Sequence, residues 1–203
     1  MSTQAERPNR KTDRTQQVLD AAAKCFVHNG FHGTSMAELA KQAGMSVGHI
    51  YHYFENKEAI IAAIVRREAD RQLDRFRELR QEKDVVKGLL DRAAPAIARR
   101  LDRGDAGLWL EVLAEAGRNP AVAAVIRDAD ETLRGAYRDV LLHLGASLGL
   151  SEPELHARVD VLIALFEGIT IRSVRHPGLS PDTLAKALQV AIRALLATPT
   201  RPN

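Results

Sequence analysis

The stretch SMAELAKQAGMSVGHIYHYF, residues 35–54, decides the fold expected for the N-terminal part of the chain. Ser35 and Glu38 have the spacing of a capping box, in which a hydroxyl and a carboxylate satisfy the free amides of a helix start. Apolar residues at helical spacing follow as far as Gly44, which ends this short helix. Ser46 can then cap a second short helix that fills the rest of the stretch. Two short helices joined by a glycine-containing turn predict a helix-turn-helix motif.

The rest of the chain is predicted to be helical, because helix caps and apolar residues at helical spacing recur while strand patterns are nearly absent. Pro95 is expected to kink or interrupt its helix, since proline lacks an amide donor and clashes with the preceding turn. The expected helices cover approximately residues 15–30, 35–44, 46–54, 57–80, 84–101, 105–117, 119–148 and 151–176, with a last one from residue 180. The sequence therefore predicts an all-α protein of about nine helices.

The composition is that of a globular protein rather than a membrane or disulfide-rich one. The 203 residues are 45% hydrophobic and 27% charged, and no apolar run is long enough to span a bilayer. The polar start has no secretory signal, so we expect a cytoplasmic protein without a membrane partner. The single cysteine, Cys25, lies among apolar residues and is expected to be a small buried side chain.

The positive charge is concentrated in the first third of the chain. Residues 1–67 contain nine Lys or Arg against six Asp or Glu, whereas residues 68–203 contain twenty of each. A basic N-terminal segment is typical of an arm that binds a polyanion, although such tails are often merely solvated. Charge alone therefore suggests a nucleic acid as the partner.

A helical wheel divides the second short helix into an inner and an outer side. The apolar residues expected to pack on the preceding helices are Val47, Ile50 and Phe54. The opposite side carries Gly48, His49 and His52, flanked by Tyr51 and Tyr53. The outer side is compact, polar and aromatic, and the amides near Ser46 form a positive helix end. We expect Gly48, His49 and His52 to read base edges, with phosphate contacts from the tyrosines and from Thr34, Ser35 and Lys57.

The same residue types could also serve a metal site or a catalytic site. His49 and His52 are one turn apart and could share a metal ion, but only Glu55 stands near them as a further ligand. No nucleophile elbow surrounds Ser46, and no glycine-rich phosphate loop occurs. We therefore expect no metal, no cofactor and no catalytic residue. An all-helical enzyme and a helical protein-interaction adaptor remain as alternatives to a DNA-binding protein, and a salt titration of duplex binding would separate them.

The segment FHGTSMAELAKQAGMSVGHIYHYFENKEAIIAAIV, residues 31–65, resembles the DNA-binding region of the TetR family of bacterial transcriptional regulators. The resemblance extends over approximately residues 14–65 and rests on Gly44, Ser46, Gly48, Tyr51, Tyr53, Phe54, Lys57 and Glu58. It implies base contacts from Val47, Gly48 and His49, and phosphate contacts from Thr34, Ser35, Tyr51, Tyr53 and Lys57. The helical wheel instead places Val47 inward and His52 outward.

The resemblance implies a domain organisation and a function. We expect a flexible basic arm at residues 1–14, a helix-turn-helix DNA-binding domain at 15–58, a helical effector-binding and dimerisation domain at 59–198, and a flexible tail at 199–203. The expected function is that of a repressor that binds double-stranded DNA and is released by a small-molecule effector. Most relatives repress, but activation is equally compatible with the sequence.

The helices expected over residues 151–176 and from residue 180 are apolar around much of their circumference. Apolar side chains on both sides of each helix must therefore be buried against other helices. The residues expected to form a homodimer through a four-helix face are Leu155, Val159, Leu162, Phe166, Ile169, Leu184, Leu188, Ile192 and Leu195. The second apolar stripe of the first of these helices consists of Val161, Leu165 and Ile171. Burial of both helices in one larger monomer core is the alternative. A two-fold dimer would place its two reading helices about 34–36 Å apart on a palindromic operator.

The segment GLWLEVLAEAGRNPAVAAVI, residues 107–126, resembles the C-terminal domain of one TetR subgroup through the pattern WLxxxAEAxRNP. In one interpretation Trp109 belongs to the core, and Glu111 and Glu115 face water. In the other, an effector cavity between helices is lined by Trp109, Glu115, Phe166, Glu167 and Thr170.

Overall fold

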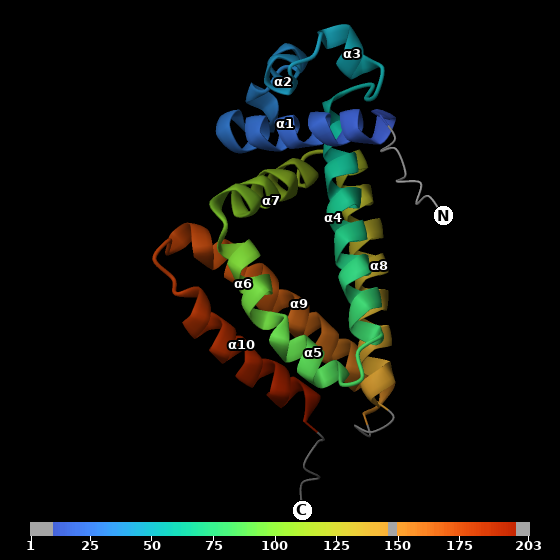
Figure 1. Ribbon diagram of the computed structural model, residues 1–203, viewed down its shortest axis with the longest axis vertical. Helices are drawn as coiled ribbons and strands as arrows, with labels where there is room; N and C mark the ends of the chain where they lie inside the picture. Colours follow the sequence, from blue (N-terminus) through green and yellow to red (C-terminus); the bar gives the residue numbers. More distant parts are fainter. Residues whose placement is uncertain (1–9, 146–149, 198–203) are drawn as a thin grey trace, which may run out of the picture.

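The structure is a computed structural model that describes residues 10–145 and 150–197, and these contain ten α-helices and no strand (Figure 1). The all-α prediction is confirmed. The helices are α1 Arg10–Gly33, α2 Met36–Ala43, α3 Val47–Tyr51, α4 Lys57–Arg80, α5 Val85–Asp91, α6 Ala93–Leu101, α7 Arg103–Ala116, α8 Pro120–Gly145, α9 Glu152–Arg175 and α10 Pro181–Leu196. No helix in these residues is long and apolar enough to cross a lipid bilayer.

The short helices begin at the expected capping residues. The Ser35 hydroxyl accepts a hydrogen bond from the Glu38 amide at 3.2 Å, and the Glu38 carboxylate accepts one from the Ser35 amide at 2.7 Å. The carboxylate also accepts a hydrogen bond from the Ser35 hydroxyl at 2.9 Å, and the bonds from the Ser35 amide and hydroxyl hold the pKa of Glu38 below its usual value. The Ser46 hydroxyl accepts from the His49 amide and caps α3, and Asn56 caps α4 in the same way. Caps are local interactions, which is why the sequence reveals them.

Three helix boundaries differ from the expectation. α1 starts at Arg10, so part of the segment expected as a flexible arm is helical, and residues 1–9 lie outside the described residues. α3 ends at Tyr51, so Phe54 reaches the core from the segment after the helix. The helix expected over residues 84–101 is divided at Arg92, because the ring of Pro95 clashes with a carbonyl one turn earlier. This division accounts for the tenth helix.

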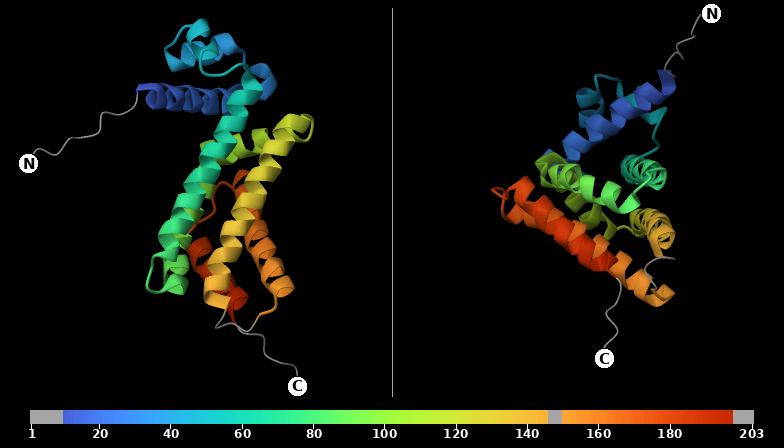
Figure 2. Two further views of the ribbon diagram at one scale, coloured as in Figure 1. Left: turned by 90° about the vertical axis from the view of Figure 1, so that its right-hand side faces the viewer. Right: turned by 60° about the horizontal axis from the view of Figure 1, so that its bottom comes forward.

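The helices form an elongated molecule with α1, α2 and α3 at one end (Figures 1 and 2). α4 starts at this end and runs along the long axis beside α8, its most extensive packing partner. α7 lies across the molecule directly below α1, whereas α6, α9 and α10 pack together in the other half. The domain boundary expected between residues 58 and 59 falls inside α4, so that one continuous helix belongs to both halves.

The molecule has two large hydrophobic cores, one in each half. The first joins α1, α2, α3 and α4 with α7 and α8, through side chains such as Phe26, Ile50 and Val112. The second lies between α5, α6, α8, α9 and α10. Because the first core includes Val112 of α7, the helix-turn-helix is anchored on the C-terminal half as well as on its own three helices.

The predicted dimer stripe lies in the second core of a single chain, and this part of the prediction is wrong. Leu155, Val159, Leu162, Phe166, Leu188 and Ile192 are buried, and Ile169, Leu184 and Leu195 are half-buried against the same core. The side of α9 that remains exposed carries Val161, Leu165, Ile171 and Val174. Both sides of α9 are apolar, and the monomer core covers the first stripe because it packs on α6.

Candidate nucleic-acid interface and ligand cavity

Helix α3 lies at the end of the molecule (Figure 1), and all of its residues except Ile50 are exposed. Ile50 is fully buried and holds the helix on the first core, whereas Gly48, His49 and His52 are exposed. Val47 is 38% exposed, so the helical-wheel assignment of this residue to the inner side is wrong. The helix has only five residues, and one inward side chain is enough to anchor its single turn.

Aromatic contacts fix the outer side of α3. The ring of Tyr53 is half-buried and lies 5.3 Å, between centroids, from the imidazoles of both His49 and His52. Tyr51 is 52% exposed, and its hydroxyl is free to project from the surface. A Cβ added at Gly48 would meet no atom within 4 Å, so the space around this position is open. An open position flanked by imidazole donors and acceptors has the chemistry for contacts to base edges.

Thr34 does not have the position of a phosphate contact. Its side chain is 1% exposed, and its hydroxyl donates to the Gly30 carbonyl at 2.8 Å and lies 3.2 Å from the Cys25 carbonyl. Gly30 has φ 72° and ψ 165°, a conformation that breaks α1 before its last turn. The hydroxyl of Thr34 therefore stabilises this break.

Lys57 is also committed to the fold. Its ammonium group donates to the carbonyls of Phe31 and Thr34, each at 2.7 Å, and lies 4.7 Å from the centroid of the Phe31 ring. Two of its three donors are therefore used to close the end of α1. Ser35 is exposed, but its hydroxyl is engaged with Glu38 in the capping box. The sequence predicts the capping role of Ser35, whereas the structural roles of Thr34 and Lys57 depend on the break at Gly30 and cannot be read from it.

Helix α7 also contacts the end of α1. The Phe31 amide donates to a carboxylate oxygen of Glu111 at 3.1 Å. The Glu115 carboxylate is buried and lies 3.0 Å from Nε2 of His32 and 3.6 Å from the guanidinium of Arg118. Glu115 therefore does not face water, and it connects the two halves of the molecule instead of lining a cavity.

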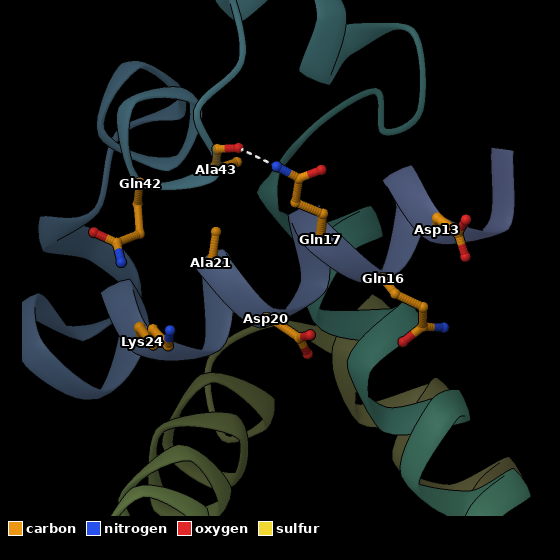
Figure 3. Close-up of a pocket in the computed structure, with 8 residues that line it drawn as sticks. All are labelled: Asp13, Gln16, Gln17, Asp20, Ala21, Lys24, Gln42 and Ala43. Carbon is orange, nitrogen blue, oxygen red and sulfur yellow. Dashed lines mark hydrogen bonds between the residues drawn. The ribbon is translucent and has the colours of Figure 1, made fainter. Parts of the chain in front are cut away.

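An open groove of about 420 Å³ lies between α1 and α2 (Figure 3). The side chain of Gln17 crosses it and donates to the Ala43 carbonyl at 2.7 Å. Its lining is mainly polar and includes the carboxylates of Asp13 and Asp20. Those negative charges oppose phosphate, and the scarcity of apolar side chains makes the groove a poor site for an organic ligand.

A second cavity, of about 200 Å³, lies in the C-terminal half between α4, α5, α6, α8, α9 and α10. Its wall combines apolar side chains with arginines, and the lining residues are Gln72, Arg75, Phe76, Glu78, Leu79, Leu89, Arg92, Ala93, Pro95, Ala96, Arg99, Arg100, Tyr137, Leu162, Phe166 and Ile192. A cavity between helices with a few polar groups has the form of a small-molecule site. Its volume fits a ligand smaller than the usual drug-sized molecule.

Arg100 is the most distinctive side chain of this cavity. It is half-buried, and its guanidinium carbon lies 4.3 Å from the centroid of the Phe166 ring. Burial lowers the pKa of Arg100 and raises that of Tyr137, whose ring packs on Phe76 at 4.3 Å between centroids. The sequence carries a signal for this placement, because residues 93, 97 and 100 share one side of α6 and the first two are buried.

Only one of the predicted effector-pocket residues lines this cavity. Phe166 contributes to the wall, whereas Trp109 packs against the first core and Glu115 contacts the end of α1. Thr170 is buried and donates to the Phe166 carbonyl, and Glu167 is exposed. The predicted set is therefore wrong as a single pocket, because α7 faces the first core and α9 faces the second.

The histidines do not form a metal site with other ligands in the part of the chain that the structure describes. Within residues 10–145 and 150–197, no group of three or more His, Cys, Asp or Glu side chains is arranged to hold a metal ion.

The exposed α3 on a three-helix core, joined by α4 to a helical half with its own cavity, defines a protein of the helix-turn-helix class. Comparison with known families agrees with this class. Residues 18–64 match the family of bacterial regulatory proteins called tetR, and residues 83–197 match the C-terminal domain of BetI-type transcriptional repressors. The chain belongs to the TetR family and is a DNA-binding transcriptional regulator.

Individual relatives support the assignment. The chain is similar to the HTH-type transcriptional regulator UidR of Escherichia coli K12, with 35% identity over 117 residues, which is 58% of this chain and 59% of UidR. This match thus spans less than two thirds of UidR. Among solved structures, Salmonella enterica GusR is 28% identical with a TM-score of 0.74, covering 96% of this chain and 99% of GusR. The FadR regulator of Bacillus subtilis, in complex with stearoyl-CoA, has the same fold at 19% identity, with a TM-score of 0.75, and the match covers 91% of this chain and 98% of FadR.

Proposed function

We propose that the protein is a repressor that binds a palindromic operator as a homodimer and is released by a small-molecule effector. The observation that carries the proposal is the exposed surface of α3, whose buried Ile50 fixes its orientation. The base-reading residues are Val47, Gly48, His49 and His52. Phosphates are contacted by Ser46, Tyr51, Tyr53 and the exposed Ser35, together with the N-terminal amides of α3. The match to a repressor C-terminal domain supports repression rather than activation.

The proposed dimer uses the exposed side of α9. Val161, Leu165, Ile171 and Val174 project from it, and each is at least 37% exposed. Val190 of α10 is 66% exposed. Exposed large apolar side chains gathered on one helix often mark an interaction surface, and we propose that a second copy of the chain covers them. A two-fold axis through this face repeats α3 on the DNA and requires an inverted repeat.

The proposed release mechanism connects the cavity with α1. α6 forms one wall of the cavity and is separated from α7 only by Asp102, which caps α7. α7 in turn holds the end of α1 through Glu111 and Glu115. An effector that prefers one arrangement of α6 therefore shifts α7, α1 and the separation of the two reading helices. The shift cannot exceed the difference in the effector's affinity for the two states.

The most informative experiment is selection of bound duplexes from a random pool with the full-length protein. We expect a palindrome whose half-sites are about one helical turn apart, and binding that weakens steeply with salt, with a log-log slope of about −0.9 per neutralised phosphate. His49→Ala is expected to lower affinity for the selected palindrome without altering stability, because this side chain is exposed. Recovery of an unsymmetrical site, or of no site, would contradict the proposal.

A further inference from the structure

The cavity in the C-terminal half has an uneven distribution of charge. Its lining contains four arginines, Arg75, Arg92, Arg99 and Arg100, and one carboxylate, Glu78. Arg75 is paired with Glu68 at 2.9 Å, and Arg92 is paired with Glu82 at 3.1 Å. Arg99 and Arg100 have no ion-pair partner among the residues that the structure describes.

The missing counter-charge matters most at Arg100, because its guanidinium lies among aromatic rings. Phe166 packs against it, and Tyr137 forms the neighbouring wall. Two carboxylates interact electrostatically with Arg100, Glu68 of α4 and the exposed Glu167 of α9. Glu68 is already paired with Arg75, and neither carboxylate forms an ion pair with the Arg100 guanidinium. Removing a cation from water is costly unless an anion compensates for the lost hydration. Within residues 10–145 and 150–197, no carboxylate forms an ion pair with Arg100.

The rest of the wall suits an apolar body. Leu79, Leu89, Leu162 and Ile192 line the cavity from four different helices. A ligand that fills this space removes apolar surface from water, which is favourable in proportion to the area buried. The cavity therefore combines a hydrophobic interior with two cationic groups, Arg99 and Arg100, that have no ion-pair partner among the described residues.

A cationic ligand is the main alternative, because three aromatic residues could surround a quaternary ammonium group. The face of Phe166 is already occupied by the guanidinium of Arg100 at 4.3 Å. A second cation there would meet the repulsion of Arg99 and Arg100, and only Glu78 of the lining would attract it. The charge distribution therefore favours an anion.

We infer that the cavity binds an amphipathic organic acid, whose apolar body fills the space between the helices and whose acidic head is neutralised by Arg100. This inference rests on the proposed function, since it gives the chemical class of the effector. Arginine suits the role, because its planar guanidinium presents two parallel donors to a carboxylate. Arg100 lies on α6, so an anion bound to it engages the helix that leads to α7.

The inference is tested by calorimetric titration of the full-length protein with three probes that share an eight-carbon chain: octanoate, 1-octanol and octyltrimethylammonium. We expect octanoate to bind at least about tenfold more tightly than octanol, as an added charge-assisted hydrogen bond would produce. Arg100→Met keeps an unbranched side chain in the wall of the cavity but removes the charge. It is expected to abolish the preference for octanoate over octanol. Arg127→Met, an exposed arginine on α8 outside the cavity, is the matched control.

Equal binding of octanoate and octanol, tighter binding of the ammonium probe, absence of binding by all three, or an unchanged preference in Arg100→Met would each overturn the inference. If Arg100→Met fails to fold, the ranking of the three probes on the natural chain still decides. Operator binding by the same samples separates the two proposals. Octanoate that binds through Arg100 without affecting operator affinity would refute its role as effector but not the ligand class. Operator binding without any anion preference would refute only the ligand class.

Discussion

Replacement of Thr34 by valine tests the role that the structure gives to this residue. Valine keeps the branched shape but removes the hydroxyl that donates to the Gly30 carbonyl at 2.8 Å, at a site only 1% exposed. A buried carbonyl that loses its partner costs about 1–3 kcal/mol. For a chain of this length we expect the melting temperature to fall by about 4–8 °C for a cost of 2 kcal/mol. Operator affinity, measured well below the melting temperature, should not change, because the hydroxyl is buried and bonded within the protein.

Thr132→Val is the matched control. Its hydroxyl also donates to the carbonyl four residues earlier, that of Asp128, at 2.8 Å, but on an exposed part of α8. Water can replace this bond, so the expected change in unfolding free energy is within about 0.5 kcal/mol. Urea unfolding of both variants measures the difference. The reasoning would be refuted by a Thr34→Val protein as stable as the natural chain, or by one of normal stability that binds its operator tenfold more weakly.

Three further predictions concern packing, dimerisation and pH. Ile50→Ala leaves a cavity beneath α3 and should lower the free energy of unfolding by about 2–5 kcal/mol in urea denaturation; a loss under 1 kcal/mol would mean that the helix is not anchored there. Val161→Glu should dissociate the dimer in sedimentation analysis, whereas Leu113→Glu, on the exposed side of α7, should not. Equal dimer dissociation constants for the two variants would exclude the proposed face. The lowered pKa of Glu38 means that its ionised form stabilises α2. This contribution is complete above the unfolded pKa of about 4.3 and is lost as the pH falls through the lower folded value, so Ser35→Ala should raise the Glu38 pKa in an NMR titration and make stability less sensitive to acid.

Agreement between sequence and structure is closest where short-range interactions decide. Ser35, Ser46 and Asn56 cap helices that begin where the pattern predicted, because a cap needs only the next three residues. The buried Ile50 followed from helical spacing in the same way. Val47 was misassigned because the wheel assumed a helix reaching residue 54, whereas α3 ends at Tyr51.

Long-range packing decided the remaining features. The hydroxyl of Thr34 and the ammonium group of Lys57 are groups that commonly contact phosphate. Because α1 is broken at Gly30, both instead donate to backbone carbonyls at the end of that helix. In the sequence the break is visible only as a glycine. The side chains that bond to the end of α1, including Glu111, come from α4 and α7.

By itself, the sequence determined the all-α class, the helix-turn-helix and the composition of its outer surface, because helical period and capping act over a few residues. Only the tertiary structure decided which apolar side of α9 belongs to the monomer core and which is left exposed, since both sides carry large apolar residues in the sequence. It also decided that the cavity lies beside Arg100 rather than Trp109, because helices distant in sequence form its walls. A pattern along one helix contains no information on which neighbour will pack against each side.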